Sequence, residues 1–202
     1  AAQQEGVQIT AETCLHYLAF TAEEIASGAT SFKCAPPIRE AENRELLWRG
    51  LEDGTIGMVV SDHSPCTPAL KKPEAGDFMQ AWGGISSLQL GLSVLWTLAK
   101  ERGFSVEQMF RWNVEGPARL AGVSDRKGRL APGYDADIVL WDDAASFVVQ
   151  PEAIRHRHHV TPYAGRRLFG QVKKTLVGGR MAYDAASNQP PATVGRFLAV
   201  RR

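Results

Sequence analysis

The 202-residue sequence predicts an α/β fold in which strand–helix units surround a parallel sheet and a segment rich in β-strands follows. Three observations predict it. Stretches typical of strands and of helices alternate three times within residues 1–122. One of these strands, residues 55–60, is a continuous apolar run, as in a strand buried on both faces of a parallel sheet. From about Asp125 short strands and turns take over, so we place a domain boundary near residues 122–127, between domains 1–122 and 123–202.

The first elements are justified by alternation and by capping patterns. Residues 7–16 alternate roughly between apolar and polar, which predicts a half-buried strand. A short helix is expected over residues 21–27, because Thr21 and Glu24 have the spacing of a capping box. Residues 31–37 indicate a short strand that ends at a double proline.

The next elements follow from helical periodicity. Residues 40–53 carry leucines at helical spacing with charges on the other face, and residues 86–100 predict a second long helix. Ser105 begins another capping-box pattern, and its helix should break near Pro117 and end by Gly122.

The last segment reads as short strands and hairpins. Residues 127–141 and residues 172–183 are typical of strands, and the second range contains a turn at Gly178 and Gly179.

Composition excludes several classes of protein. No apolar run approaches the ~18–20 residues that cross a bilayer, and the first residues lack a signal-peptide pattern, so we expect neither a membrane partner nor a secretory leader. Three cysteines are too few for a disulfide framework and predict a reducing, cytoplasmic location.

The net charge of +1 conceals an asymmetry. Residues 151–202 hold ten Lys and Arg against two acidic residues, so this segment carries about +8 and the rest of the chain about −7. A basic segment can bind nucleic acid, but this one shows no nucleic-acid-binding module. We therefore interpret it as facing the acidic part within the fold or across subunits, and we expect no nucleic-acid partner.

Two polar side chains follow predicted strands, where the reacting groups of parallel α/β proteins gather. They are His16 and Asp62, and an imidazole and a carboxylate are suitable ligands for a divalent metal such as Zn²⁺. Taken singly, each has a plainer interpretation: a hydrogen-bonded structural histidine, or an aspartate that forms a turn.

The motifs around these residues distinguish between the interpretations. They are ETCLHY (12–17), KCAPPIR (33–39), SDHSPCT (61–67), AWGGISS (81–87), KGRLAPGYDAD (127–137) and HRHHVTPY (156–163). Together they resemble the C-terminal part of the allantoinase family, which belongs to the cyclic amidohydrolase group with dihydroorotase and hydantoinase. The resemblance covers roughly residues 7–185. One departure is Leu15, where the family usually has proline.

The resemblance implies the C-terminal part of a (β/α)8 TIM barrel of the metal-dependent amidohydrolase type, plus part of a small β-sandwich domain. It also implies two divalent ions, Zn first and Co, Mn or Fe as alternatives, bridged by a carboxylated lysine and a hydroxide. By motif, His16 matches a ligand histidine and Asp62 the ligand aspartate. In the family, that aspartate is also the general base. It takes the proton of the hydroxide that attacks the ring amide and passes it to the leaving nitrogen.

The resemblance also implies a surface for a flat cyclic ureide. Segments matching those around Ala35 and Trp82 hold the imide face of the ring through backbone groups, so both residues are candidate substrate contacts. His63 could orient Asp62, contact substrate or make a structural hydrogen bond. We interpret Cys34 and Cys66 as small buried residues near the site rather than nucleophiles.

Three other features have the sequence pattern of a metal site but are not interpreted as one. His156 and His158 have the His-x-His spacing but follow the barrel segment, so we expect them at the surface or at an interface. Lys33 ends a predicted strand, but the carboxylated lysine of the family belongs to an earlier strand. The acidic run 133–137 returns the chain to the β-rich segment.

The three strand–helix units account for only about a third of a barrel. The His pair of the first strand, the carboxylated lysine and one further histidine have no counterpart. The sequence is therefore interpreted as a C-terminal fragment of an enzyme that hydrolyses the hydantoin ring of allantoin to allantoate. We expect the fragment alone to be inactive, and by analogy with relatives we expect a homo-oligomer, a tetramer.

Two other functions stay open. One is a hydantoinase or dihydropyrimidinase acting on a related cyclic ureide. The other is a non-catalytic relative that serves as an assembly scaffold. The presence of both His16 and Asp62 argues against a scaffold, which needs neither a metal ligand nor a base.

Overall fold

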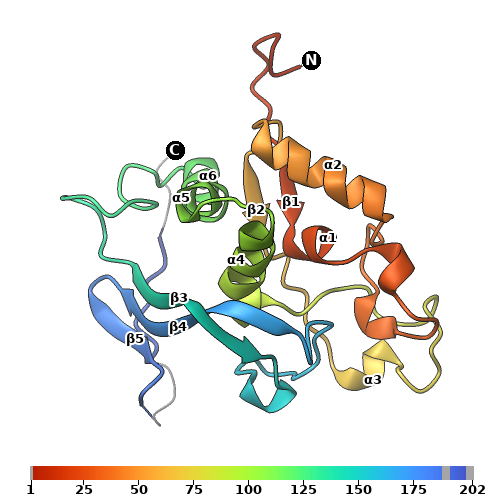
Figure 1. The fold of residues 1–202 in the computed structure, drawn as a ribbon. Coiled ribbons are helices and arrows are strands. Elements are labelled where there is room, and N and C mark those ends of the chain that lie inside the picture. The colour runs from red at the N-terminus through yellow and green to blue at the C-terminus, as the bar shows by residue number, and fades with distance from the viewer. Residues whose placement is uncertain (1, 188–191, 199–202) are drawn as a thin grey trace.

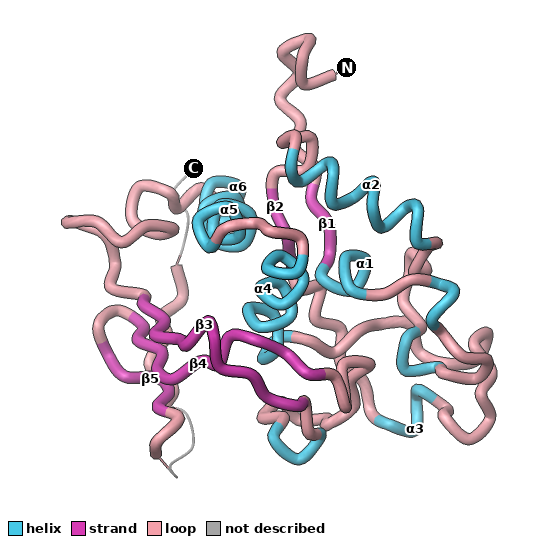
Figure 2. Tube along the Cα trace, in the orientation of Figure 1, coloured by secondary structure: helices cyan, strands magenta, loops and turns pink. Residues whose placement is uncertain are grey.

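The computed structural model describes residues 2–187 and 192–198 and contains two sheets joined by helices (Figures 1 and 2). In the first sheet β1 (Glu12–Cys14) and β2 (Met58–Val60) run parallel, with Glu12 opposite Met58 and Cys14 opposite Val60. In the second, β3, β4 and β5 form an antiparallel sheet in that order. The bounds of these three strands are Ile138–Val148, Arg167–Val177 and Arg180–Asp184.

The described residues contain six α-helices. They are α1 (Leu15–Ala19), α2 (Ala41–Glu52), α3 (Pro68–Lys71), α4 (Gly91–Glu101), α5 (Val106–Phe110) and α6 (Gly116–Leu120). Short 3-10 turns lie at Ala22–Glu24, Thr30–Phe32, Leu88–Leu90 and Pro151–Ala153, and a π-helical turn, Arg111–Glu115, joins α5 to α6. None of the helices among residues 2–187 and 192–198 is long and apolar enough to span a membrane.

Several predicted elements are confirmed. The helix expected over residues 40–53 is α2, and the buried strand expected over residues 55–60 contains β2. The hairpin at Gly178 and Gly179 joins β4 to β5, with both glycines at positive φ. At Ser105 both hydrogen bonds of the predicted capping box are present.

Other predictions are wrong for identifiable reasons. Residues 31–37 are not a strand. Thr30–Phe32 is a 3-10 turn, and the two prolines that follow have no N–H group for a sheet. The first strand ends at Cys14, and His16 lies in the first turn of α1 instead. Pro117 does not break the helix, because it occupies the first turn of α6, where a missing N–H costs little.

The predicted helix starts are also shifted. The helix expected to begin at Ser86 begins with the 3-10 turn at Leu88, and α4 follows. Near Thr21 only a 3-10 turn forms. The Thr21 hydroxyl donates to the Glu24 carboxylate, so the predicted capping box is absent.

Helix α4 is the contact between the two sheets. It carries buried Leu95 and Trp96, and it packs along β4. The Ser93 hydroxyl donates to the Gly170 carbonyl at 2.6 Å, and the Thr97 hydroxyl accepts from the Phe169 amide at 2.8 Å. A single hydrophobic core therefore includes residues of both sheets.

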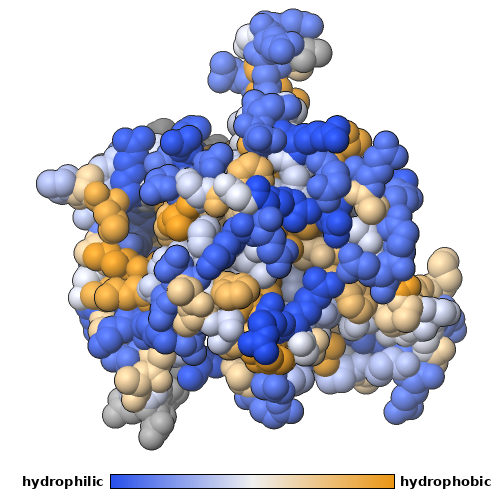
Figure 3. Space-filling model, viewed as in Figure 1, coloured by the Kyte–Doolittle hydropathy of each residue, from blue (hydrophilic) through white to orange (hydrophobic). Residues whose placement is uncertain are grey.

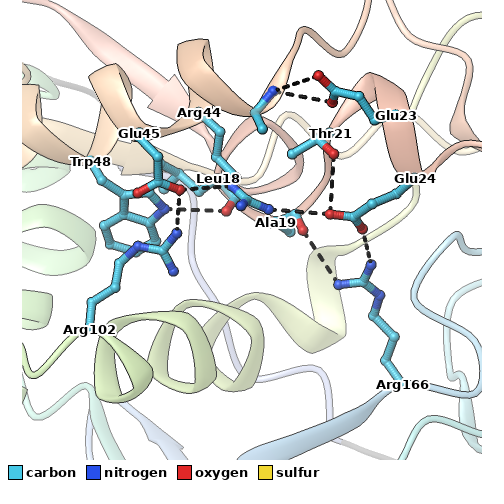
Figure 4. A network of polar contacts seen from close by, with 11 residues as sticks. Leu18, Ala19, Thr21, Glu23, Glu24, Arg44, Glu45, Trp48, Arg102 and Arg166 are labelled. Carbon is cyan, nitrogen blue, oxygen red and sulfur yellow. Dashed lines mark hydrogen bonds and ion pairs between the residues drawn. The ribbon is translucent and has the colours of Figure 1, made fainter.

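A polar network ties the start of β4 to the first helices (Figure 4). Arg166 pairs with Glu24 at 3.1 Å, and Glu24 pairs with Arg44 of α2 at 3.3 Å. Glu45 bridges Arg44 to Arg102 after α4, at 3.1 Å and 2.8 Å. The Arg166–Glu24 pair is the kind of contact expected if the basic segment faces acidic residues within the fold. Arg201 and Arg202 of that segment lie outside the described residues.

The surface is mixed in polarity. In the view of Figure 3, hydrophobic residues gather on the side where β5 and the loop before β3 lie, among hydrophilic neighbours. Leu130, Leu140 and Met181 are among the exposed large hydrophobic residues of the chain. Apolar side chains exposed singly are normal on folded proteins.

Candidate metal and substrate site

His16 is a buried imidazole without a hydrogen-bond partner. Its side chain lies in the first turn of α1, directly after β1, and is fully buried. Neither ring nitrogen has a partner among the described residues. Burial lowers the pKa of His16 to about 4, although the charge of Asp62 acts in the opposite direction. The ring is therefore neutral at neutral pH, which is the form that binds a metal.

Asp62 lies two residues after β2 and is exposed. Its backbone has φ of +41°, a left-handed conformation that aspartate tolerates better than most residues, and its carbonyl accepts from the Ser64 hydroxyl at 2.8 Å. Because β1 and β2 are parallel and Cys14 pairs with Val60, the residues that follow both strands emerge at one edge of the sheet.

That register brings the two predicted ligands together. One ligand atom from each of Cys14, His16 and Asp62 lies within 4.8 Å of the other two. Nitrogen, oxygen and sulfur donors of this kind suit a divalent transition metal, and the two unpartnered nitrogens of His16 fit a metal ligand. The juxtaposition that the sequence analysis requires is present, and the metal-binding role stays a prediction.

Cys14 was missed as a member of this cluster. It ends the strand that precedes His16, and that position was the available signal. Burial, followed by the charges of Asp62 and Glu12, raises the pKa of Cys14 to about 11. Cys34 is buried but Cys66 only half-buried, and burial raises the pKa of both thiols. That neither thiol is a nucleophile stays a prediction.

His63 is anchored by backbone amides. Its Nδ1 accepts from the N–H groups of Ser87 at 3.0 Å and Leu88 at 3.1 Å, and its backbone pairs in parallel with Ile85. In the neutral ring the proton is therefore on Nε2, which can donate to another group. The structural hydrogen bond is thus present, and a role toward Asp62 or substrate stays a prediction.

His156 is half-buried, and the expectation that it lies at the surface or at an interface stays a prediction. Its ring packs edge-on against His63 with the centroids 5.0 Å apart, and both ring nitrogens are buried without a partner in the described residues. Gln89 holds the segment in place, donating to the Ala153 carbonyl and accepting from the Arg155 amide. Sequence spacing could not reveal this contact, because the hydrogen bonds join residues more than 60 positions apart.

The two predicted substrate contacts lie on neighbouring backbone segments. Ala35 is exposed and Trp82 is 48% exposed. The Gly84 amide donates to the Lys33 carbonyl at 2.9 Å, which joins the two segments. The Tyr17 hydroxyl donates to the Pro36 carbonyl at 2.7 Å, which links them to the helix that carries His16. That backbone groups of these two segments hold the substrate ring stays a prediction.

Comparison with known proteins gives consistent matches. Residues 3–182 match the family model described as the amidohydrolase family. The allantoinase of Streptomyces avermitilis is 50% identical over 98% of this chain and 43% of its own length. The allantoinase of Saccharomyces cerevisiae is 42% identical over 98% of this chain and 42% of its own length.

Solved structures agree with the sequence matches. The L-hydantoinase (dihydropyrimidinase) of Arthrobacter aurescens superposes with a TM-score of 0.87 and 30% identity, over 94% of this chain and 42% of that one. A D-hydantoinase from Bacillus sp. AR9 gives a TM-score of 0.79 with 29% identity, over 91% of this chain and 41% of that one. The chain spans about two fifths of the length of the proteins it matches.

Proposed function

The chain belongs to the amidohydrolase family, and from this premise we propose that the protein containing it hydrolyses the hydantoin ring of allantoin to allantoate. The observation that carries the proposal is the meeting of His16 and Asp62 at one edge of the parallel sheet. Relatives named allantoinase, 42% and 50% identical over 98% of the chain, support allantoin as the substrate.

His16 and Asp62 would hold a divalent metal, with zinc as the first candidate and cobalt, manganese or iron as alternatives. When bound, the metal lowers the pKa of a water molecule and polarises the ring carbonyl. The whole protein would hold two such ions, and the carboxylated lysine that bridges them in the family has no counterpart in this chain.

Asp62 is proposed as the general base and acid. Its carboxylate takes a proton from the water that attacks the ring amide carbonyl, and it returns that proton to the ring nitrogen as the C–N bond breaks. The new C–O bond gives a carboxylic acid, which loses its proton to solvent and becomes a carboxylate, so one water is consumed and nothing is oxidised or reduced. His16 stays neutral throughout because its ring is buried.

The backbone around Ala35 and Trp82 is proposed to hold the ring. A cyclic ureide offers N–H donors and C=O acceptors in one plane, and backbone carbonyls and amides are their natural partners. The Nε2–H of His63 is available for Asp62 or for substrate, since its Nδ1 is already occupied by two amides.

The chain alone is proposed to be inactive. Of the one group of three metal-ligating side chains in the described residues, only His16 and Asp62 belong to the ligand set that the family resemblance implies, whereas a catalytic zinc normally has three protein ligands plus an open position. Around this chain a complete barrel needs ~200–250 residues. The cysteines of the described residues are all free, which supports a reducing, cytoplasmic location. We propose a homo-oligomer, as expected from the family resemblance, without a nucleic-acid or membrane partner.

The test compares three cyclic ureides on the purified protein at its natural length, with metal analysis. We expect the highest kcat/KM for allantoin and about two metal ions per subunit. Higher kcat/KM for hydantoin or dihydrouracil would instead support a hydantoinase or dihydropyrimidinase. Absence of both metal and turnover would support the scaffold interpretation.

A further inference from the structure

Lys71 is a buried lysine whose ammonium contacts backbone carbonyls. It is the last residue of α3, and its side chain is 5% exposed. Its Nζ donates to the carbonyls of Lys33 at 3.0 Å, Trp82 at 3.1 Å and Gly84 at 2.5 Å. An ammonium group has three N–H donors, and three acceptors converge on this one. Sequence analysis missed Lys71, because nothing in its neighbourhood marks it as buried.

A lysine is seldom fully buried unless it is paired, because taking the charge out of water is costly. Here the partners found are carbonyl dipoles, and burial lowers the pKa of Lys71. Hydrogen bonds from a charged donor are roughly twice as strong as neutral ones, so three of them hold their acceptors firmly. A structure that keeps such a group needs the three carbonyls in one place.

The three carbonyls belong to the two segments proposed to hold the substrate ring. Lys33 lies two residues before Ala35, and Trp82 and Gly84 form the second segment. The Trp82 amide also donates to the Leu70 carbonyl at 2.8 Å, so α3 holds this segment through both Leu70 and Lys71. The second segment then lies against the loop of Asp62, where the Ser64 amide donates to the Ile85 carbonyl at 2.9 Å.

The packing leaves this second segment little freedom. A Cβ atom added at Gly84 would lie 2.6 Å from the Ser64 carbonyl oxygen, closer than real contacts allow. A shift of residues 82–84 away from residues 33–35 would therefore change their fit to the Asp62 loop as well.

We propose that Lys71 is a positioning residue, which clasps the backbone of residues 33–35 to that of residues 82–84 so that the two segments form one surface for the substrate ring. The inference rests on the proposed function, because it assigns the ring to that surface. It assigns Lys71 no contact with the reacting atoms.

The first test is the kinetics of Lys71→Met in the whole, metal-loaded protein. Methionine keeps an unbranched stem and removes the charge and the donors. Because the clasped backbone would bind the ring equally in the ground and transition states, we expect KM for allantoin to rise about tenfold with kcat within about threefold. The matched control is Lys72→Met. The Lys72 ammonium donates to the Gln80 side chain and to no carbonyl of residues 33–35 or 82–84 in the described part of the chain, so KM should stay unchanged. An unchanged KM for Lys71→Met overturns the proposal.

The second test does not depend on the substrate. Amide hydrogen exchange in the same protein should become faster for residues 33–39 and 82–86 in Lys71→Met, and stay unchanged in α2. Unchanged exchange in both segments overturns the proposal that Lys71 holds them together. Should Lys71→Met not fold, Lys71→Gln, which keeps two donors, is judged by the same two readouts.

The substrate preference of the wild-type protein distinguishes failure of the proposed function from failure of the role proposed for Lys71. If it hydrolyses hydantoin or dihydrouracil in preference to allantoin, the substrate assignment is wrong, and KM for the preferred ring then tests Lys71. A fall of kcat in proportion to lost metal, with KM and exchange unchanged, shows that Lys71 does not position the ring.

Discussion

His16 and Asp62 show what single residues reveal in a sequence. Both lie at the ends of predicted strands, and their motifs resemble one family, so their meeting at one sheet edge could be predicted. Cys14 and His156 could not be placed in the same way. The position of Cys14 depends on how far the strand extends, and that of His156 depends on hydrogen bonds from Gln89 between distant parts of the chain.

At this scale we predict that His16→Asn, in the whole protein, loses at least one bound metal ion per subunit. Asparagine cannot replace the imidazole nitrogen, and removing one ligand weakens a site that has few. The matched control is Cys14→Ala at the other end of the same cluster, which should keep its metal because the ligand set implied by the family contains no cysteine. Metal analysis after dialysis measures both. Full metal content in His16→Asn would remove His16 from the ligand set.

The start of a helix could be predicted where hydrogen bonds between residues close in sequence determine it. The capping box at Ser105 formed as predicted, because α5 places the Gln108 amide within reach of the serine hydroxyl. The same pattern at Thr21 failed, because a 3-10 turn forms there and the Glu24 amide bonds to the Thr21 carbonyl instead. Sequence spacing cannot separate these two outcomes.

We predict that Ser105→Ala destabilises the protein by about 1 kcal/mol, the usual cost of losing an N-cap. Ser105→Asp keeps an oxygen acceptor for the Gln108 amide and should cost less. Denaturant unfolding of the two variants measures the difference. Equal stability of Ser105→Ala and the wild type would show that the cap contributes nothing.

Helix α6 packs closely on β2 at Gly116. A Cβ atom there would lie 2.7 Å from the Gly57 carbonyl oxygen and 2.8 Å from the Met58 Cβ. Replacing glycine by alanine in a helix normally stabilises the protein by ~0.5–1 kcal/mol, whereas overpacking costs ~1–3 kcal/mol. The clash therefore outweighs the gain, and the substitution should lower the free energy of unfolding. We therefore predict a lower Tm for Gly116→Ala. The control is Gly57→Ala, whose Cβ would meet only the Ala11 carbonyl, at 3.9 Å. A Tm equal to or above that of the wild type would show that the helix shifts freely.

For the whole molecule, the alternation of strands and helices predicted an α/β fold, and the TIM barrel was implied by the family resemblance. The family match and the hydantoinase structures confirm part of a TIM-barrel-type amidohydrolase with mixed α/β structure. The strand predicted over residues 31–37 failed although its end was placed at Pro36 and Pro37, because Thr30–Phe32 forms a 3-10 turn instead. How α4 joins the two sheets was also beyond prediction, since the Ser93 and Thr97 hydrogen bonds cross more than 70 residues.

The polar network of Figure 4 allows a prediction of how strongly Arg166 and Glu24 are coupled. Arg166 pairs with Glu24 and lies over the Phe20 ring at 4.4 Å, but the two charged side chains are 37% and 43% exposed. Exposed pairs contribute little, so a double-mutant cycle of Arg166→Gln and Glu24→Gln should give a coupling of ~0.2–1 kcal/mol that shrinks in 1 M salt. A coupling well above this range, or one that is insensitive to salt, would contradict the assignment of a screened surface pair.

The most direct test of Asp62 as general base and metal ligand is kcat for allantoin in Asp62→Asn, assayed in the whole protein with its metal content determined. Asparagine keeps the shape of the side chain and removes the base, so the account predicts a loss of about 10²–10⁴-fold or more. Asp53→Asn, an exposed aspartate that accepts from the Thr55 amide, is the control and should keep its activity. Asp62→Asn that retains more than about a tenth of wild-type kcat would contradict the account, because Asp62 could then be neither the base nor an essential ligand.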